Sequence, residues 1–327
     1  MRRASPVVLT LVPLAVAVLM AACGQAGMPV EVRAHPDPLS ALASDDASLA
    51  AHKRLVFDLW RTIVNAGHVE RADDLLAEGY IQHSPVLPTG RAAFKQIFSA
   101  VPRRDVPQLV EPPLVASIAE GDLVVMSLLE SVPAGTHAPA FTTTHFNLFR
   151  VEDGRLAEHW HSVRTAPNAA VALPEEGGPQ PVTGATGAAQ EALLSAADPV
   201  LAGNKRLVFD LWRTVVEAGR DEEAQRFIAM DFVDHSPVGA SGLRSITSRF
   251  AARADLPVQP WLRAPLVAVV AEGDLVALVR MQELPHPHHA GRTYTLAWFD
   301  QFRIASGRII EHWDAASPAD PPGAPAW

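Results

Sequence analysis

Residues 53–64 read KRLVFDLWRTIV and residues 205–216 read KRLVFDLWRTVV, so eleven of the twelve positions are identical. In the first stretch Leu55, Leu59 and Ile63 recur at helical spacing, which predicts an amphipathic helix with one buried face. A match of this length within one chain indicates a duplicated unit. We therefore expect the same helix to open two copies of one domain.

Further matches follow in the same order in both copies. They are HSPV at His83 and His235, AEGDLV at Ala119 and Ala271, and EHW ending at Trp160 and Trp313. The offset is 152 residues up to the loop after Val132 and 153 beyond it. Solenoid and propeller repeats have periods of roughly 20–50 residues, so this period indicates a repeated globular domain.

The composition supports two ordinary domains. With 327 residues, of which 48% are apolar, each half is long enough to bury a core. The net charge of −9 and the lack of a basic run argue against a nucleic-acid partner. The sequence contains no nucleotide or phosphate-loop motif, and we expect no cofactor. The single cysteine excludes an internal disulfide.

The first 23 residues have the pattern of an export signal. Arg2 and Arg3 precede an apolar run over 7–20, and Ala21 and Ala22 lead to the lone Cys23. Residues 19–23 resemble the lipobox of bacterial lipoproteins, which implies that Cys23 is lipidated and that the protein is anchored in the cell envelope. Its only membrane contact would then be the lipid. The alternative is an ordinary secretory peptide in which the cysteine is incidental.

The order of elements predicts an α+β unit. Short helices are expected at 71–77 and 92–100 in the first copy and at 221–229 and 243–252 in the second. Segments 114–119, 123–132, 140–151 and 155–163 are rich in β-branched and aromatic residues between Gly-containing turns, which is typical of an antiparallel meander. Helices followed by such strands form an α+β domain.

These patterns divide the chain into six parts. We predict a signal peptide at 1–23, a flexible tether at 24–38, domain 1 at 39–165, a linker at 166–188, domain 2 at 189–317 and a tail at 318–327. The linker is rich in Pro, Gly, Ala and Thr, and the tail holds four prolines.

The helix, the HSPV turn, the GD hairpin and the final FR–GR–EHW segment together resemble the SnoaL-like polyketide cyclase branch of the nuclear-transport-factor-2-like superfamily. The resemblance covers both copies. It implies two tandem cone domains, each with N-terminal helices packed into a curved antiparallel sheet around an apolar pocket. It also implies that the two domains pair as an intramolecular pseudo-dimer. The fold hosts isomerases, cyclases, hydrolases, dehydratases and binding domains, so it does not decide the function.

Strand alternation selects the residues that face the expected pocket. Trp298, Asp300 and Phe302 share one face of their strand. The resemblance also places a carboxyl at the position of Asp300 inside the pocket. On the last strand, Ile310, His312 and Asp314 are predicted to alternate inward. Asp300, His312 and Asp314 could therefore converge, which makes domain 2 the candidate active site.

Asp300 and His312 suit chemistry next to a carbonyl, because one group removes a proton while another stabilises the resulting oxyanion. In an apolar cone Asp300 is expected to have a raised pKa, as a base or as a protonated donor. Asp314 is the third catalytic candidate. The alternative is that Asp300 and His312 form a buried hydrogen-bonded pair that only fixes the register of two strands.

Domain 1 differs where the candidate chemistry lies. Asn147 replaces Asp300, His161 replaces Asp314, and His159 keeps the position of His312. Asn cannot exchange a proton near neutral pH, so this cone is expected to bind a ligand or support assembly without catalysis. An alternative is a Zn or Fe site at His145, His159 and His161, but the favoured prediction is no metal.

The candidate substrate-binding residues are His83, His235, Trp298, Phe302, Asn147, His159 and His161. Each of the two turn histidines precedes a Ser-Pro pair, where lining the pocket and capping the backbone are equally good interpretations. The sequence thus predicts an envelope-anchored protein that binds a small, largely apolar carbonyl compound. Domain 2 would act as a cyclase, isomerase or lyase, or both domains would form a non-catalytic binding module.

Overall fold

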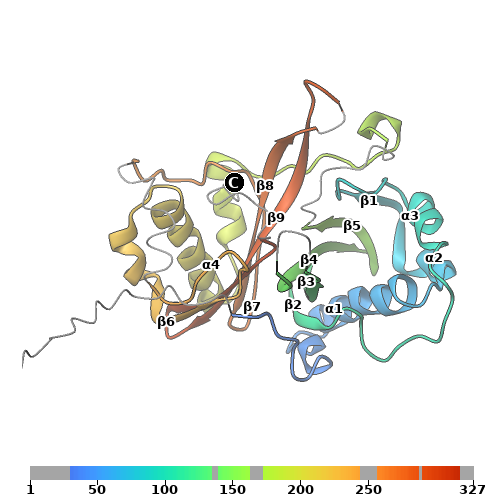
Figure 1. The fold of residues 1–327 in the computed structure, drawn as a ribbon, viewed down its shortest axis with the longest axis horizontal. Helices are drawn as coiled ribbons and strands as arrows, with labels where there is room; N and C mark the ends of the chain where they lie inside the picture. Colours follow the sequence, from blue (N-terminus) through green and yellow to red (C-terminus); the bar gives the residue numbers. More distant parts are fainter. Residues whose placement is uncertain (1–29, 135–138, 163–171, 244–255, 287–288, 317–327) are drawn as a thin grey trace, which may run out of the picture.

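The computed structural model describes residues 30–134, 139–162, 172–243, 256–286 and 289–316. The signal peptide with Cys23, the predicted helix after Leu243 and the tail at 318–327 lie outside this part of the chain. Figure 1 shows domain 1 in blue to green and domain 2 in yellow to red, with one sheet in each. The predicted α+β fold class with two tandem domains is confirmed.

Domain 1 begins with helices that its sequence specifies locally. They are η1 Ser40–Leu42, α1 Ala47–Leu59, the π-helical turn η2 Trp60–Val64, η3 Val69–Arg71, α2 Ala72–Leu75 and α3 Arg91–Phe98. The carboxylate of Asp46 caps α1 by accepting hydrogen bonds from the backbone N–H groups of Ser48 and Leu49. Shortly after the end of η2, Gly67 turns the chain away with a φ of 71°, which favours glycine.

The sheet of domain 1 has the order β1-β5-β4-β3-β2. Its strands are β1 Leu76–Gln82, β2 Leu114–Glu120, β3 Leu123–Val132, β4 Phe141–Glu152 and β5 Arg155–His161. The last four agree with the predicted strands to within about two residues. The sheet is mixed, because β1 pairs with β5 in parallel. The sequence prediction missed β1, and assigned its start to a helix at 71–77.

Domain 2 repeats this plan. After η4 Pro174–Glu176 and η5 Gly187–Leu194, its helices are α4 Pro199–Leu211, the π-helical turn η6 Trp212–Val216 and η7 Asp221–Arg226. The sheet order is β6-β10-β9-β8-β7, with strands β6 Ile228–Asp234, β7 Leu266–Glu272, β8 Leu275–Pro285, β9 Thr293–Ala305 and β10 Arg308–Asp314. Here too the edge strand β6, parallel to β10, replaces part of an expected helix.

Each sheet has two apolar faces with different partners. The inner face packs on the domain's own helices: Val208 and Trp212 of domain 2 belong to one buried cluster with Phe302. The outer faces share a third cluster, in which Phe146 stacks on Phe299 with ring centroids 5.4 Å apart. Trp160 and Trp313 belong to this shared cluster. The two domains therefore contact each other through the backs of their sheets.

Two buried lysines connect the domains in a reciprocal way. Lys53 Nζ lies 2.8 Å from Glu272 Oε1, and the other oxygen of Glu272 accepts a hydrogen bond from the backbone N–H of Ala119 at 2.7 Å. The equivalent Lys205 pairs with Glu120 at 2.5 Å, and Glu120 accepts from Ala271 N. Each lysine also donates to backbone carbonyls of its own domain.

Two extended segments, residues 30–32 and 180–182, cross between the domains and are called the crossing segments below. The backbone N–H of Val30 donates to Asp234 O, and Val32 is buried in the shared cluster. In the linker, Gln180 N donates to Gln82 O, and Val182 N donates to Thr295 Oγ1. This part of the expected tether and of the expected linker is therefore packed against the opposite domain. No helix among the described residues is long and apolar enough to span a membrane.

We predict that Glu272→Ala lowers the free energy of unfolding by about 3 kcal/mol, because it leaves the buried Lys53 ammonium without a counter-charge. Urea unfolding measures this. Glu120→Ala should have a similar effect through Lys205, whereas Asp73→Ala at an exposed ion pair should change the free energy little. An equal effect of all three substitutions would contradict the role of the buried lysines.

Candidate functional site

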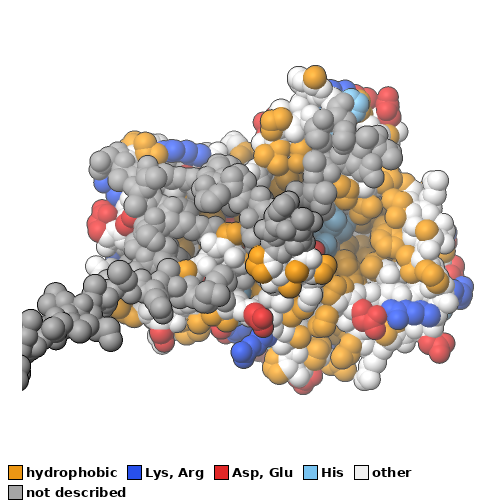
Figure 2. All heavy atoms as spheres, in the orientation of Figure 1, with side chains coloured by type: hydrophobic (Ala, Val, Ile, Leu, Met, Phe, Trp, Pro, Cys, Tyr) orange, Lys and Arg blue, Asp and Glu red, His pale blue; other side chains and the backbone are white. Residues whose placement is uncertain are grey.

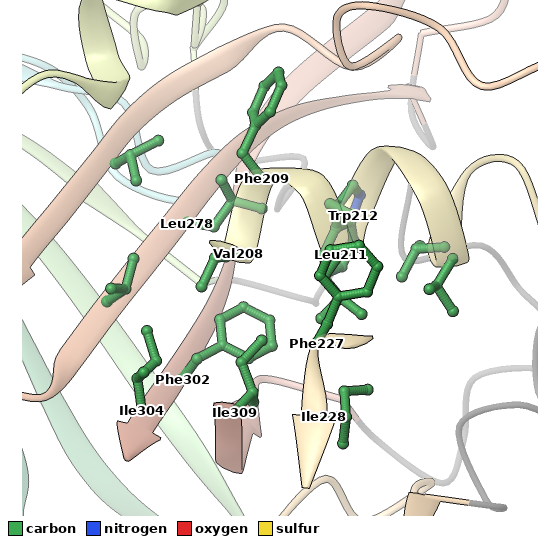
Figure 3. Close-up of a cluster of buried hydrophobic side chains, with 14 of the residues drawn as sticks. Val208, Phe209, Leu211, Trp212, Phe227, Ile228, Leu278, Phe302, Ile304 and Ile309 are labelled. Carbon is green, nitrogen blue, oxygen red and sulfur yellow. The ribbon is translucent and has the colours of Figure 1, made fainter. Parts of the chain in front are cut away.

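The polar site of domain 2 lies on the inner face of its sheet. Figure 3 shows the apolar cluster around it, with Val208, Leu211 and Trp212 of α4 and η6 facing Phe302 and Ile309 of the strands. Ile309, not Ile310 as expected, belongs to this core, because the pairing of β10 shifts register between Ile309 and Glu311. His312 and Asp314 nevertheless lie in buried positions as predicted by alternation.

His312 lies between two carboxylates. Its Nε2 is 3.1 Å from Asp300 Oδ1 on β9, and its Nδ1 is 3.0 Å from Asp234 Oδ1 on β6. The backbone N–H of Ser236 also donates to Asp234 Oδ1, which fixes that carboxylate. Both ring nitrogens must carry hydrogen to serve two carboxylates, so the ring is an imidazolium.

A buried arginine completes the array. Arg280 on β8 donates to Asp300 Oδ2 at 2.8 Å, and its guanidinium lies 4.0 Å from the centroid of the Trp212 ring. A planar cation over an indole face gains a cation–π interaction that partly offsets the cost of its burial. Both oxygens of Asp300 are thus paired with positive groups.

These contacts set the protonation of the array. Burial alone would lower the pKa of His312, but the carboxylates, above all Asp234, raise that pKa to about 10. Burial would raise the pKa of Asp300, but Arg280 and His312 lower it below the ordinary value. The expectation of a raised pKa at Asp300 is therefore wrong, because the sequence did not reveal its cationic partner. Asp300 is a carboxylate at neutral pH.

Asp314 converges on the same point. One oxygen of Asp314, one of Asp300 and a ring nitrogen of His312 lie within 4.8 Å of one another, the spacing of metal ligands. Asp314 Oδ1 also accepts from the backbone N–H of Ala316. Because both nitrogens of His312 already serve carboxylates, the ring has no lone pair for a metal, and the three groups fit a proton-holding array better than a metal site.

Domain 1 holds the same array without charge. Around His159, Gln82 replaces Asp234, Asn147 replaces Asp300 and Leu128 replaces Arg280. Gln82 Nε2 lies 3.1 Å from His159 Nδ1, and Asn147 Oδ1 lies 3.0 Å from His159 Nε2. Burial lowers the pKa of His159 to about 3, so this ring is neutral.

His145 and His161 of domain 1 lie beside this array. The ring centroids of His145 and His161 are 5.4 Å apart, and those of His159 and His161 are 5.5 Å apart. Burial lowers the pKa of His145 and of His161. Ser84 Oγ lies 2.5 Å from His161 Nε2, and both nitrogens of His159 are already bonded. Both nitrogens of His159 and Nε2 of His161 are thus engaged by protein groups, which disfavours the alternative of a shared metal.

The remaining candidates separate into two groups. Phe302 stacks on His312 at 4.9 Å and Trp298 is buried on the same strand, so both lie in the cone of domain 2. His83 and His235 do not line a cone. They stack on Trp160 and Trp313 at the outer face, and their Nδ1 atoms contact carbonyls of the crossing segments. The capping interpretation therefore agrees with the structure, and the pocket-lining one does not.

Three residues of the domain 2 site were missed from the sequence: Asp234, Arg280 and Glu217. Glu217, at the end of η6, accepts from the backbone N–H of Arg263, and burial raises its pKa. A signal was present, because in domain 1 these positions are the uncharged Gln82, Leu128 and Asn65. A comparison of the copies at every charged position would have identified them.

A surface cavity of about 300 Å³ lies outside both cones, on domain 1. Its lining includes Asp58, Arg61, His68 and Arg71. Arg61 already donates to Asp58 Oδ1 at 2.7 Å, and His68 Nε2 is 2.7 Å from Arg104 O. These polar groups stabilise the helix end, and we assign the cavity no chemistry.

A family model described as "SnoaL-like domain" matches residues 57–159 and 209–312, which together make up well over half of the chain. The chain belongs to the SnoaL-like family. The match confirms the predicted resemblance of both copies to SnoaL-like domains. Among curated proteins, none matches the sequence.

Several solved structures align with part of the chain. TsrD from Streptomyces laurentii is 20% identical, with a TM-score of 0.25, over 37% of this chain and 90% of its own. IdmH from Streptomyces antibioticus is 21% identical, with a TM-score of 0.25, over 34% and 90%. A nuclear-transport-factor-2-like protein from Mesorhizobium loti is 20% identical, with a TM-score of 0.26, over 40% and 98%.

We predict that the free energy of unfolding falls by on the order of 2 kcal/mol between pH 7 and 9. His312 has an ordinary pKa of 6.5 and a folded pKa of about 10, so its stabilisation is complete below pH 6.5 and is lost as the pH rises through 10. Urea unfolding at several pH values measures the change. His312→Gln should flatten this alkaline slope.

His159 provides the matched control with the opposite sign. Because its folded pKa is about 3, its stabilisation is lost as the pH falls below 6.5 towards 3. His159→Gln should therefore flatten the acidic side and leave the alkaline slope unchanged. If His312→Gln kept the alkaline slope, the imidazolium assignment would be wrong.

Proposed function

We propose that domain 2 binds a small, largely apolar carbonyl compound and transfers a proton next to the carbonyl, as in an aldol-type cyclisation, an isomerisation or a related hydration. Domain 1 would lack this activity. The observation that carries the proposal is the charged array of Asp300, His312 and Arg280 at positions where the duplicate has Asn147, His159 and Leu128. Of the two arrays, only that of domain 2 contains a carboxylate that can accept a proton from a substrate.

The chemistry would start at Asp300. Its carboxylate takes a proton from the carbon beside the carbonyl, and the electron pair moves to the carbonyl oxygen as an enolate. Arg280 and the His312 imidazolium lie within hydrogen-bonding distance of Asp300 and provide positive charge beside the developing anion. Asp234 keeps His312 charged and oriented. The protonated Asp300 then returns the proton to the product, either directly or through Asp314, a second carboxylate within reach that would accept it from Asp300 and pass it on.

The lowered pKa of Asp300 narrows the substrate class. A weak base removes a proton efficiently only when the C–H acid is itself strong, because proton transfer works best between groups of similar pKa. This favours a carbon activated by two carbonyls, or by a carbonyl and an aromatic ring, over a simple ketone. IdmH and a protein from Jannaschia are named as candidate polyketide cyclases, which is compatible with this class.

The alternative is a binding module without catalysis. One observation favours it: both nitrogens of His312 and both oxygens of Asp300 are already paired within the protein. In that case the array only ties β6, β8, β9 and β10 together. We further propose that the two domains remain a pseudo-dimer in solution, supported by the shared apolar cluster and the reciprocal lysine pairs.

For the location, we propose a lipid anchor at Cys23 in the cell envelope. Support comes from the sequence of residues 1–23, which combines two arginines, an apolar run and small residues before a lone cysteine. Six residues separate Cys23 from Val30, the first described residue, which contacts domain 2. An extended chain of that length spans about 25 Å at most, so the anchor would hold domain 2 close to the membrane.

We predict that the full-length protein accelerates exchange of the C1 protons of 2-tetralone for deuterium in D₂O, followed by proton NMR. Asp300→Asn should lower the protein-dependent rate by a factor of about 10² to 10⁴, because the base is lost. Asn147→Ala in domain 1 is the control and should keep the rate. Full activity in Asp300→Asn, with the fold verified by circular dichroism, would favour the binding module.

We predict that the full chain, expressed in a bacterium grown with radioactive fatty acid, incorporates the label and is found in the membrane fraction. Cys23→Ser should abolish the label, because the thiol that carries the lipid is removed. Labelling of the Cys23→Ser protein at the same level would rule out the anchor. Release of unlabelled wild-type protein would instead support an ordinary secretory peptide.

A further inference from the structure

In domain 1, Gln82, His159 and Asn147 form a hydrogen-bonded relay, and the direction of its hydrogen bonds is fixed. The backbone N–H of Ser84 donates to Gln82 Oε1 at 2.9 Å, so Gln82 Nε2 is the donor towards His159 Nδ1. His159 is neutral and accepts at Nδ1, and its hydrogen is therefore on Nε2. That hydrogen is donated to Asn147 Oδ1. A single backbone N–H thus orients three side chains.

The relay ends in a donor that has no acceptor. Since Asn147 Oδ1 faces His159, its Nδ2 points away from the ring. This nitrogen is buried and makes no hydrogen bond within the described part of the protein. Buried amide donors are nearly always paired, because an unpaired one costs stability. The position therefore calls for an acceptor that the described residues do not supply.

Aromatic rings and neutral imidazoles surround Asn147. His159 stacks on Phe149 at 4.3 Å, and Trp60 makes an edge contact with His145. His145 and His161 are only partly buried. Figure 2 shows histidine side chains in a hollow bordered by hydrophobic side chains on the domain 1 side of the molecule. The carboxylate of Glu130 lies next to this group, with Oε2 3.9 Å from His145 Nδ1.

Domain 2 has the same relay with the opposite polarity. Ser236 N again fixes the first side chain, but this is the carboxylate of Asp234, so His312 donates at both nitrogens. The relay then ends in Asp300, which accepts only and is covered by Arg280. Domain 1 therefore presents a donor at the position where domain 2 presents an acceptor.

We propose that the cone of domain 1 is a second binding site, which takes a neutral, largely apolar compound and holds its carbonyl oxygen with Asn147 Nδ2. Anionic ligands are disfavoured because the described residues around the donor supply no positive charge. Since the donor is covered in the ligand-free protein, the ring of His145 or His161 turns aside when the oxygen enters. The site does not depend on catalysis in domain 2.

The test uses the full-length protein and 6-acetyl-2-(dimethylamino)naphthalene, a neutral ketone whose fluorescence shifts to the blue in an apolar site. Asn147→Asp should weaken its binding by at least about tenfold, because a donor is replaced by a carboxylate that repels the carbonyl oxygen. Asp73→Asn, at the exposed ion pair with Lys95, is the control and should leave the affinity for the ketone unchanged. Both variants are checked for folding by circular dichroism.

Nitrogen NMR provides a second measurement that does not depend on a variant. The ring nitrogens of His159 should show the Nε2–H tautomer, and saturating ketone should shift the side-chain amide signal of Asn147. An Nδ1–H tautomer, an unshifted amide signal, or unchanged affinity in Asn147→Asp would overturn the proposal. Deuterium exchange in 2-tetralone reports on domain 2 separately, so failure of one site is distinguishable from failure of the other.

Discussion

One buried imidazole per domain determines what each cone can do. His159 and His312 occupy the same place, between an edge strand and a central strand, and each uses both ring nitrogens there. The side chains on either side decide how many hydrogens the ring holds. Two carboxylates make His312 a cation and two amides leave His159 neutral, so a difference of a few side-chain atoms separates a charged cone from an uncharged one.

The paired sheets isolate these two arrays from each other. The shared cluster between the sheets is apolar, and its polar contacts are limited and specific, such as Ser127 Oγ to Gln301 Oε1 at 2.8 Å. Ion pairs between the domains lie at the ends of the sheets, where Lys53 and Lys205 reach across. After the duplication, the charged side chains inside one cone could therefore be replaced without disturbing the contact between the two sheets.

The sequence was sufficient for the elements that carry a strong local pattern. The repeated helix and strands β2–β5 follow hydrophobic periodicity, and the inward direction of Asp300 follows from alternation. Strands β1 and β6 were not predictable in this way, because LAEGYIQ and IAMDFVD do not alternate regularly and become strands through pairing with β5 and β10.

The errors at the candidate site have the same origin. Asp234 was missed because it lies at the end of the unrecognised β6, and Arg280 was missed because a charged residue in a strand is usually expected to face solvent. Without Arg280, the pKa of Asp300 was expected to rise. For His83 and His235 the sequence left pocket lining and backbone capping open, because the direction of a turn residue depends on long-range contacts, here with the crossing segments.

The crossing segments also impose an order on folding. The segment at 30–32 leaves the ribosome about 200 residues before Asp234 and His235, to which it binds. The linker at 180–182, by contrast, binds Gln82 and His83 of a domain that has already been synthesised. Domain 1 can thus receive its crossing segment during translation, whereas the segment that precedes it must wait for domain 2. The final step of folding is then the closure of a long loop, which brings residues 30–32 to domain 2. Closing a loop of this length costs conformational entropy and slows folding.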